Sequence, residues 1–166
     1  AVKIPYGSGQ YKMVVFLPAE GKNVGELIAD FSAENRKKWM NAFEPEEHVV
    51  VTMPRFKFDF ELQMKEVLKK MGMPKAFDPS QSDFSKIADA DDLHINSVIH
   101  KSFIDVNETG TEAAAVTSVT FGVTSVGPEQ PEKIFFTVNK PFIFTIIEEE
   151  TGAILFIGEV NHPEYN

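Results

Sequence analysis

The sequence of 166 residues contains no cysteine. Disulfide bonds and thiol chemistry are therefore excluded for this chain. The absence suits a cytosolic protein and a bacterial extracytoplasmic protein equally well, so cysteine usage alone leaves the compartment open.

Basic charge and long apolar runs are also scarce. The chain has 16 Lys and Arg against 25 Asp and Glu, which gives a formal net charge of −9. Binding to a nucleic-acid backbone needs a basic patch, so we expect no nucleic-acid partner. No stretch approaches the roughly 18 consecutive apolar residues of a membrane helix, so we expect no membrane span.

Motifs for catalysis and for metal binding are missing too. The sequence has no nucleophile elbow, phosphate loop or zinc-binding helix motif. His94 and His100 fall on one face of a predicted strand, but no third metal ligand accompanies them. The acids Asp89, Asp91 and Asp92 lack the glycine and the distal glutamate of a calcium loop. We therefore expect no catalytic residue, no metal and no cofactor.

The apolar pattern that is present predicts strands mixed with short helices. Ser32 is expected to cap a helix that exposes residues 35–38 and turns Trp39 and Met40 toward the core. Pro54 suggests a bend or an edge within the strand predicted over 48–60. Strands are expected over 2–6, 11–17, 48–60, 93–106, 134–138, 142–147 and 154–160, and helices from 24, after Ser32, over 61–71 and near 84–87.

The most informative stretch runs from residue 107 to residue 121. Its centre, 112–115, is small and helix-tolerant, and Gly110 before it is a free pivot. The same stretch also fits a strand, in which successive side chains point to opposite faces. Only one of the two faces would then carry a charge, which is that of Glu112. It can therefore lie exposed as a loop or join a sheet. The uncharged face would hold Thr111, Ala113, Ala115, Thr117, Val119 and Phe121.

This stretch resembles the hinge of the reactive-centre loop of the serpins. Three further stretches resemble serpin landmarks in the right order: 98–101 the strand that leads into the hinge, 139–144 the buried strand after the loop, and 154–163 the last strand and C-terminal signature. Four such motifs together are a specific signal, and the alternative is that 110–115 is only a flexible linker. The hinge pattern is occupied by Glu108, Gly110, Thr111, Glu112, Ala113, Ala114 and Ala115.

The resemblance implies an α+β serpin fold, with mixed β-sheets A, B and C and surrounding helices. It covers residues 1–166, but only the C-terminal portion of a single serpin domain, because a complete serpin is more than twice as long. The chain enters directly as a strand without an initiator Met. We therefore expect a missing N-terminal segment of the same serpin, present as a companion chain, without which the fold is incomplete. The reactive-centre loop is expected at about 108–132.

The resemblance also implies a function, that of a suicide-substrate inhibitor of serine proteases and also of cysteine proteases. The protease attacks the loop and forms a covalent acyl-enzyme. The cleaved loop then inserts into sheet A as a new strand, a strand addition known for serpin loops. Thr111, Ala113 and Ala115 are small, as in inhibitory members. His100 is implied as a structural switch residue beneath the opening of sheet A.

The position of the reactive bond follows from counting along the loop. Fifteen positions from Gly110, as is usual in the family, give Thr124 and Ser125, although a longer loop can shift this register. Val123 or Thr124 suits an elastase-like protease, and Phe121 suits a chymotrypsin-like one. The absence of Arg and Lys from this part of the loop disfavours trypsin-like targets.

Two other functions stay open at this point. A non-inhibitory serpin could have a storage, carrier or chaperone-like role, although the small-residue hinge argues against it. A hydrolase that uses His100 with a carboxylate is a third hypothesis. For the compartment, we favour a secreted or bacterial extracytoplasmic protein.

Overall fold

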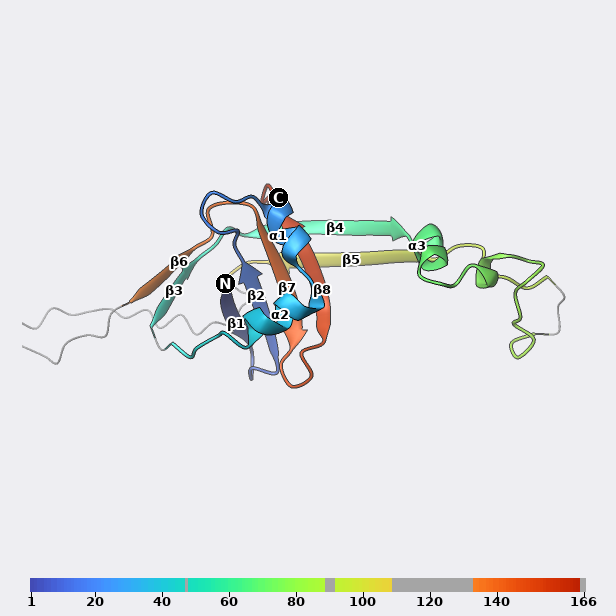
Figure 1. Ribbon diagram of the computed structural model, residues 1–166, viewed down its shortest axis with the longest axis horizontal. Helices are drawn as coiled ribbons and strands as arrows, with labels where there is room; N and C mark the ends of the chain where they lie inside the picture. Colours follow the sequence, from blue (N-terminus) through green and yellow to red (C-terminus); the bar gives the residue numbers. More distant parts are fainter. Residues whose placement is uncertain (47, 89–91, 109–132, 165–166) are drawn as a thin grey trace, which may run out of the picture. The chain divides into compact units, whose positions relative to one another are not determined.

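The computed structural model of the chain describes residues 1–46, 48–88, 92–108 and 133–164 (Figure 1). The chain forms two compact units, Ala1–Phe56 with Val106–Asn166, and Lys57–Asp105. In chain order the elements are β1 (Val2–Tyr6), β2 (Tyr11–Phe16), α1 (Val24–Asp30), α2 (Ala33–Met40), β3 (Val49–Thr52), β4 (Phe56–Gln63), α3 (Lys65–Lys70), the 3-10 helix η1 (Lys75–Phe77), β5 (Ile99–Val106), β6 (Ile134–Thr137), β7 (Phe142–Glu148) and β8 (Ile154–Val160).

The first unit is built on a four-stranded antiparallel sheet with the order β1-β2-β7-β8. The strands predicted over 2–6 and 11–17 are found as β1 and β2, which pair as an antiparallel hairpin. Gly7 and Gly9 make its turn with φ angles of +46° and +88°, which glycine adopts at little steric cost. β2 and β7 are the inner strands, and most of their residues are buried.

Helices α1 and α2 lie on one face of this sheet (Figure 1). The ring of Phe16 on β2 lies 5.3 Å from that of Phe31 and 5.8 Å from that of Trp39, measured between centroids. Trp39 and Met40 pack against the buried cluster of β2 and β7, as the sequence predicts. The exposure expected for residues 35–38 is found at Lys37 and Lys38 only, because Asn35 and Arg36 are half-buried. Arg36 donates to the carbonyl oxygen of Gly152 at 3.1 Å.

Polar caps begin both helices. Asn23 accepts a hydrogen bond from the Glu26 N–H at 3.0 Å, and the Glu26 carboxylate accepts one from the Asn23 N–H at 3.0 Å. This reciprocal pair satisfies two N–H groups that a helix start otherwise leaves without partners. The predicted cap at Ser32 is confirmed, since its hydroxyl accepts from the Asn35 N–H at 3.1 Å.

The strand predicted over 48–60 is wrong as one element, because the chain makes two strands there. β3 pairs in parallel with β6, whereas β4 pairs with β5. Pro54 lies in the break and has no N–H to donate to a ladder. Just after the break, Phe56 is fully buried, with its ring 5.8 Å from that of Phe142 and 5.3 Å from that of Phe144.

The second unit contains most of β4 and β5, with α3 and η1. The helix predicted over 61–71 is wrong at its start, because β4 continues to Gln63 and α3 begins at Lys65. The Met64 N–H donates to the carbonyl oxygen of Val98 at 2.8 Å, so pairing between the two segments persists to this point.

The strand predicted over 93–106 is also too long at its start. Before β5, the Ile95 N–H donates to the carbonyl oxygen of Ala76 at 2.8 Å, and the Ser82 hydroxyl donates to that of Leu93 at 2.8 Å. These contacts hold the segment in a loop. The short helix predicted near 84–87 is a single turn, closed by the Ile87 N–H on the carbonyl oxygen of Phe84 at 2.8 Å.

The described part of the chain contains no helix that is long and apolar enough to cross a membrane. Strands predominate, helices are short, and parallel and antiparallel pairings both occur. The predicted α+β class with several mixed sheets is therefore confirmed.

Candidate functional site

The strand that leads into the predicted hinge is β5, which ends at Val106. It has β4 along one side, and within the described ranges no strand is paired along its other side. Ile104 and Val106 are buried near its end. Within the part of the chain that the structure describes, the outer backbone groups of β5 are therefore not paired with a strand.

The β4–β5 pair has one polar face and one apolar face. Lys101 Nζ lies 2.8 Å from a carboxylate oxygen of Glu61, and Lys57 Nζ lies 5.9 Å from the ring centroid of Phe103, which places these four side chains on one face. His100, which is exposed, belongs to the alternate positions of β5 and so to the other face. On β4 that other face carries Phe56, Phe58, Phe60 and Leu62.

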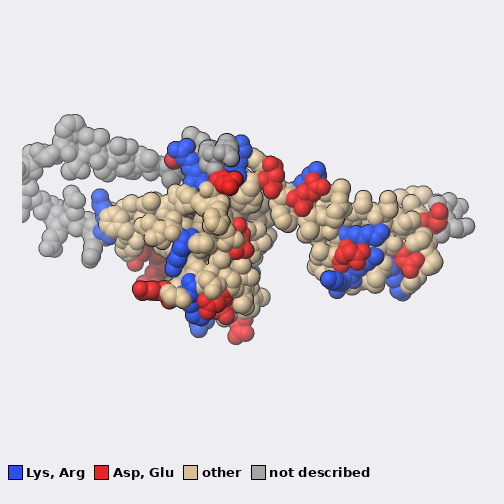
Figure 2. Space-filling view, turned by 90° about the horizontal axis from the view of Figure 1, so that it is seen from above, with Lys and Arg blue, Asp and Glu red and all other residues tan. Residues whose placement is uncertain are grey.

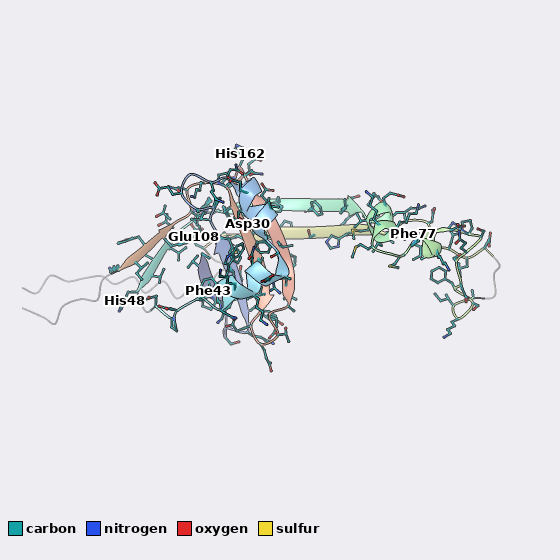
Figure 3. All side chains as sticks on the ribbon, in the orientation of Figure 1. Asp30, Phe43, His48, Phe77, Glu108 and His162 are labelled. Atoms are coloured by element: carbon teal, nitrogen blue, oxygen red, sulfur yellow. The ribbon has the colours of Figure 1, made fainter. Side chains whose placement is uncertain are left out.

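The first residue of the predicted hinge, Glu108, makes an ion pair with Arg55 (Figure 3). Arg55 Nε donates to Glu108 Oε1 at 2.9 Å, and it lies 2.9 Å from Oε2 as well. Both side chains are largely exposed, so the pair adds little to global stability, on the order of 0–1 kcal/mol. It ties the start of the predicted loop to the break between β3 and β4.

The far end of the predicted loop is tied to β3 itself. β6 pairs with β3 from Val49 opposite Ile134 to Thr52 opposite Thr137. The Ile134 N–H also donates to the carbonyl oxygen of His48 at 3.0 Å (Figure 3). Residues 48–55 therefore hold both ends of the segment that the sequence assigns to the reactive-centre loop.

Sequence reasoning missed the role of Arg55, which lies within the single strand predicted over 48–60. The two partners of the ion pair are 53 positions apart in the chain. Local spacing carries no signal at such a separation. Only the pairing of β4 with β5 brings the residues that precede and follow these strands together.

Most of the predicted site lies outside the described residues. Glu108 and His100 are described, whereas the hinge after Glu108 and the reactive bond stay predictions. The predicted residues outside the described ranges are Gly110, Thr111, Glu112, Ala113, Ala114, Ala115, Phe121, Val123, Thr124 and Ser125.

The described carboxylates do not form a catalytic or metal-binding group. Within that part of the chain, no three His, Asp or Glu side chains gather as metal ligands. Hydrogen bonds from the Ser80 hydroxyl and N–H lower the pKa of Asp78, and those from Ser85 lower the pKa of Asp83. A lowered pKa keeps a carboxylate ionised, which is the opposite of what a general acid needs at neutral pH.

On the face that Figure 2 shows, Lys and Arg lie interspersed with Asp and Glu and do not merge into one basic patch. Recognition of a phosphate backbone depends on such a patch.

The sequence profile described as serpin (serine protease inhibitor) matches residues 1–163. The chain belongs to the serpin family. Serpins are protease inhibitors and generally not catalytic enzymes.

Individual serpins match over nearly all of the chain. An uncharacterised serpin-like protein of Thermococcus kodakarensis is 42% identical over 166 residues, which cover 99% of this chain and 37% of that protein. Intracellular coagulation inhibitor 2 of Tachypleus tridentatus is 38% identical over 160 residues, which cover 96% of this chain and 38% of that protein. The crystal structure of native protease nexin-1 with heparin superposes with a TM-score of 0.76 at 29% identity, covering 97% of this chain and 40% of that one. The chain thus spans about two fifths of the serpins that it matches.

Proposed function

We propose that this serpin inhibits serine proteases as a suicide substrate, through cleavage of the segment 109–132 and its insertion beside β5. The single observation that carries the proposal is the open side of β5, the strand that runs directly into the hinge sequence. Family membership and a relative named as a coagulation inhibitor support it.

The chemistry belongs to the protease, and this chain supplies the substrate. The active-site serine attacks the scissile carbonyl carbon, the peptide bond breaks, and the carbonyl side of the loop stays bound as an ester. The segment from Gly110 onward is then free to pair with β5 and to carry the esterified protease with it. A cysteine protease would form a thioester in the same way.

Insertion has to compete with hydrolysis of the ester. Each ladder hydrogen bond contributes about 0.5–1.5 kcal/mol net, so about ten inserted residues contribute on the order of 10 kcal/mol. Small side chains at Thr111, Ala113 and Ala115 keep the entering strand narrow, which favours fast insertion. With the reactive bond at Thr124–Ser125, the target is an elastase-like protease, and with Phe121 it is a chymotrypsin-like one.

The inhibitor also needs the remainder of the serpin, which we propose to be an N-terminal segment that acts as a companion to this chain. The matched relatives are longer, and the apolar face of β4 exposes Phe58, Phe60 and Leu62. Large exposed apolar side chains that gather on one face mark a surface that another part covers. The inserted strand likewise needs a neighbour on its far side, which the companion would supply.

Incubation with elastase, chymotrypsin and trypsin tests the proposal on the complete serpin. We expect a complex with one of the first two that survives boiling in detergent, and mass spectrometry of the released peptide locates the bond. A protease with its active-site serine blocked is the control, and it should form no complex.

A matched variant tests insertion itself. Thr111→Arg places a charge where the strand must enter, so we expect cleavage at the same bond with the covalent complex strongly reduced. Loop cleavage of the unchanged protein without any covalent complex would identify a non-inhibitory serpin.

A further inference from the structure

The C-terminal end of α3 carries two of the six methionines of the chain, Met71 and Met73 (Figure 1 labels α3). Met71 is 73% exposed and Met73 is 44% exposed, whereas Met13 is only 2% exposed. The half-buried methionines are Met40, Met53 and Met64. Because the chain has no cysteine, these thioethers are its only sulfur groups. A dissolved oxidant therefore reaches sulfur most readily at the end of α3.

The same two methionines flank the glycine that ends the helix. Gly72 has a φ angle of +101°, in the left-handed region that closes many helices. The Met73 N–H donates to the carbonyl oxygen of Leu68 at 3.0 Å, and the Gly72 N–H donates to that of Lys69 at 3.1 Å. These are the two hydrogen bonds of a Schellman motif, in which Met71 is the C-cap residue.

The motif gives the two methionines different roles. The residue after the glycine of a Schellman motif frequently packs against the residue whose carbonyl oxygen it binds. Here that pair is Met73 and Leu68, and Leu68 is half-buried. Met71 lies before the glycine and is the more exposed of the two methionines. A polar group on Met73 would therefore disturb the end of α3, whereas a polar group on Met71 would lie in solvent.

We propose that the end of α3 is an oxidation-sensitive site, at which hydrogen peroxide converts first Met71 and then Met73 into the sulfoxide. The thioether sulfur attacks one peroxide oxygen, so that an S–O bond forms and the O–O bond breaks. The departing hydroxide takes the proton of the transferred hydroxyl group and leaves as water. Sulfur loses two electrons and the peroxide gains them. The inference concerns α3 alone and does not depend on the proposed function.

Oxidation of Met73 should loosen the last turn of α3. The helix has six residues and none of them is buried, so little besides the cap holds its end. A sulfoxide is polar and disrupts apolar contacts, which removes the reason for Met73 to stay against Leu68. The two hydrogen bonds of the cap should then open more often, whereas oxidation of Met71 alone should leave them unchanged.

Peptide mass spectrometry of the complete serpin, after timed exposure to hydrogen peroxide, tests the order of reaction. We expect Met71 to be oxidised at least about fivefold faster than Met13, with Met73 second among the six methionines. Equal rates at all six would overturn the inference. A Met71 that reacts as slowly as Met13 would overturn it as well, because another part of the serpin would then cover the site.

Hydrogen–deuterium exchange tests the effect on the helix. Protein in which Met73 has been oxidised should exchange the amides of Gly72 and Met73 faster than unoxidised protein. Met73→Leu keeps an apolar side chain without sulfur, so peroxide should leave its exchange unchanged, whereas Met71→Leu should still respond. Exchange that stays the same after oxidation of Met73, or that rises equally in the Met73→Leu protein, would overturn the inference.

Discussion

At the residue scale, position 158 has no room for a side chain, because the ring of Phe144 lies over Gly158. A Cβ atom at this position would lie 2.5 Å from Cε1 and 2.7 Å from Cζ of Phe144. Phe144 is buried and packs against Phe56, so its ring has little room to move away. The close approach of two strands here therefore depends on the missing side chain.

We expect Gly158→Ala to destabilise the protein by about 1–3 kcal/mol, because the core must shift to admit one methyl group. Denaturant unfolding measures the change. Phe144→Leu combined with Gly158→Ala is the control, and its loss should be smaller than the sum of the two single losses. Strict additivity would show that the contact is not the cause.

The ion pair between Arg55 and Glu108 is a second feature of this scale. Glu108→Gln should lower the free energy of unfolding by less than about 1 kcal/mol, since both groups are exposed. Glu108→Lys should cost more, because it places two cations together. The charge swap Arg55→Glu with Glu108→Arg should recover most of that loss, and a swap as unstable as Glu108→Lys would contradict the pairing.

At the scale of elements, α1 is a helix of seven residues with no buried residue, so its ends matter. Asn23→Ala removes the side chain that accepts from the Glu26 N–H, and we expect a loss of about 0.5–2 kcal/mol in denaturant unfolding. Asn23→Asp keeps an acceptor oxygen and should remain near the unchanged protein. Equal losses for both variants would point away from the cap.

The turn between β7 and β8 makes the stability of the protein depend on pH. A hydrogen bond from Lys12, 2.7 Å away, lowers the pKa of Glu149 below its ordinary value of 4.5. The carboxylate therefore adds stability at pH values above 4.5, and this contribution is lost as the pH falls through the lowered pKa.

The variant Glu149→Gln tests this dependence, with the melting temperatures of the variant and of the unchanged protein measured between about pH 7 and about pH 3. The unchanged protein should be the more stable one at neutral pH, and the difference should shrink in acid. Glu150→Gln removes one charge from the same turn and is the control. A difference that grows in acid would contradict the sign.

Elements with regular alternation or clear caps could be predicted, whereas the ends of several other elements could not. The range of β8, 154–160, and the cap at Ser32 agree with the structure. The start of α3 was misplaced because Leu62 continues the alternation of β4 and also fits a helical face. The split at Pro54 sends β3 and β4 to different partners, and a strand's choice of partner is not encoded in its own sequence.

At the scale of the whole molecule, loop insertion should alter stability. Cleavage of segment 109–132 by a protease that is then removed should raise the melting temperature, because the freed strand adds ladder hydrogen bonds beside β5. The Thr111→Arg protein, cleaved in the same way, should show a much smaller rise. No rise in either protein would argue for a loop that cannot insert.

Only part of the candidate site could be predicted from the sequence. The hinge motif Glu108–Ala115 was found from its residues and indicated the family, which the comparisons confirm. The anchoring of both loop ends on residues 48–55 could not be predicted, because it arises from contacts between distant parts of the chain.

The strand order has a further consequence for the molecule after its loop has been cut. β7 lies between β2, which precedes the loop, and β8, which follows it, and six residue pairs join β2 to β7. A nick anywhere in 109–132 therefore leaves two polypeptides that share one sheet and are joined in it by the pairing of β2 with β7. They should elute together in gel filtration and separate only in denaturant, so native size alone cannot report whether the chain has been cut in this segment.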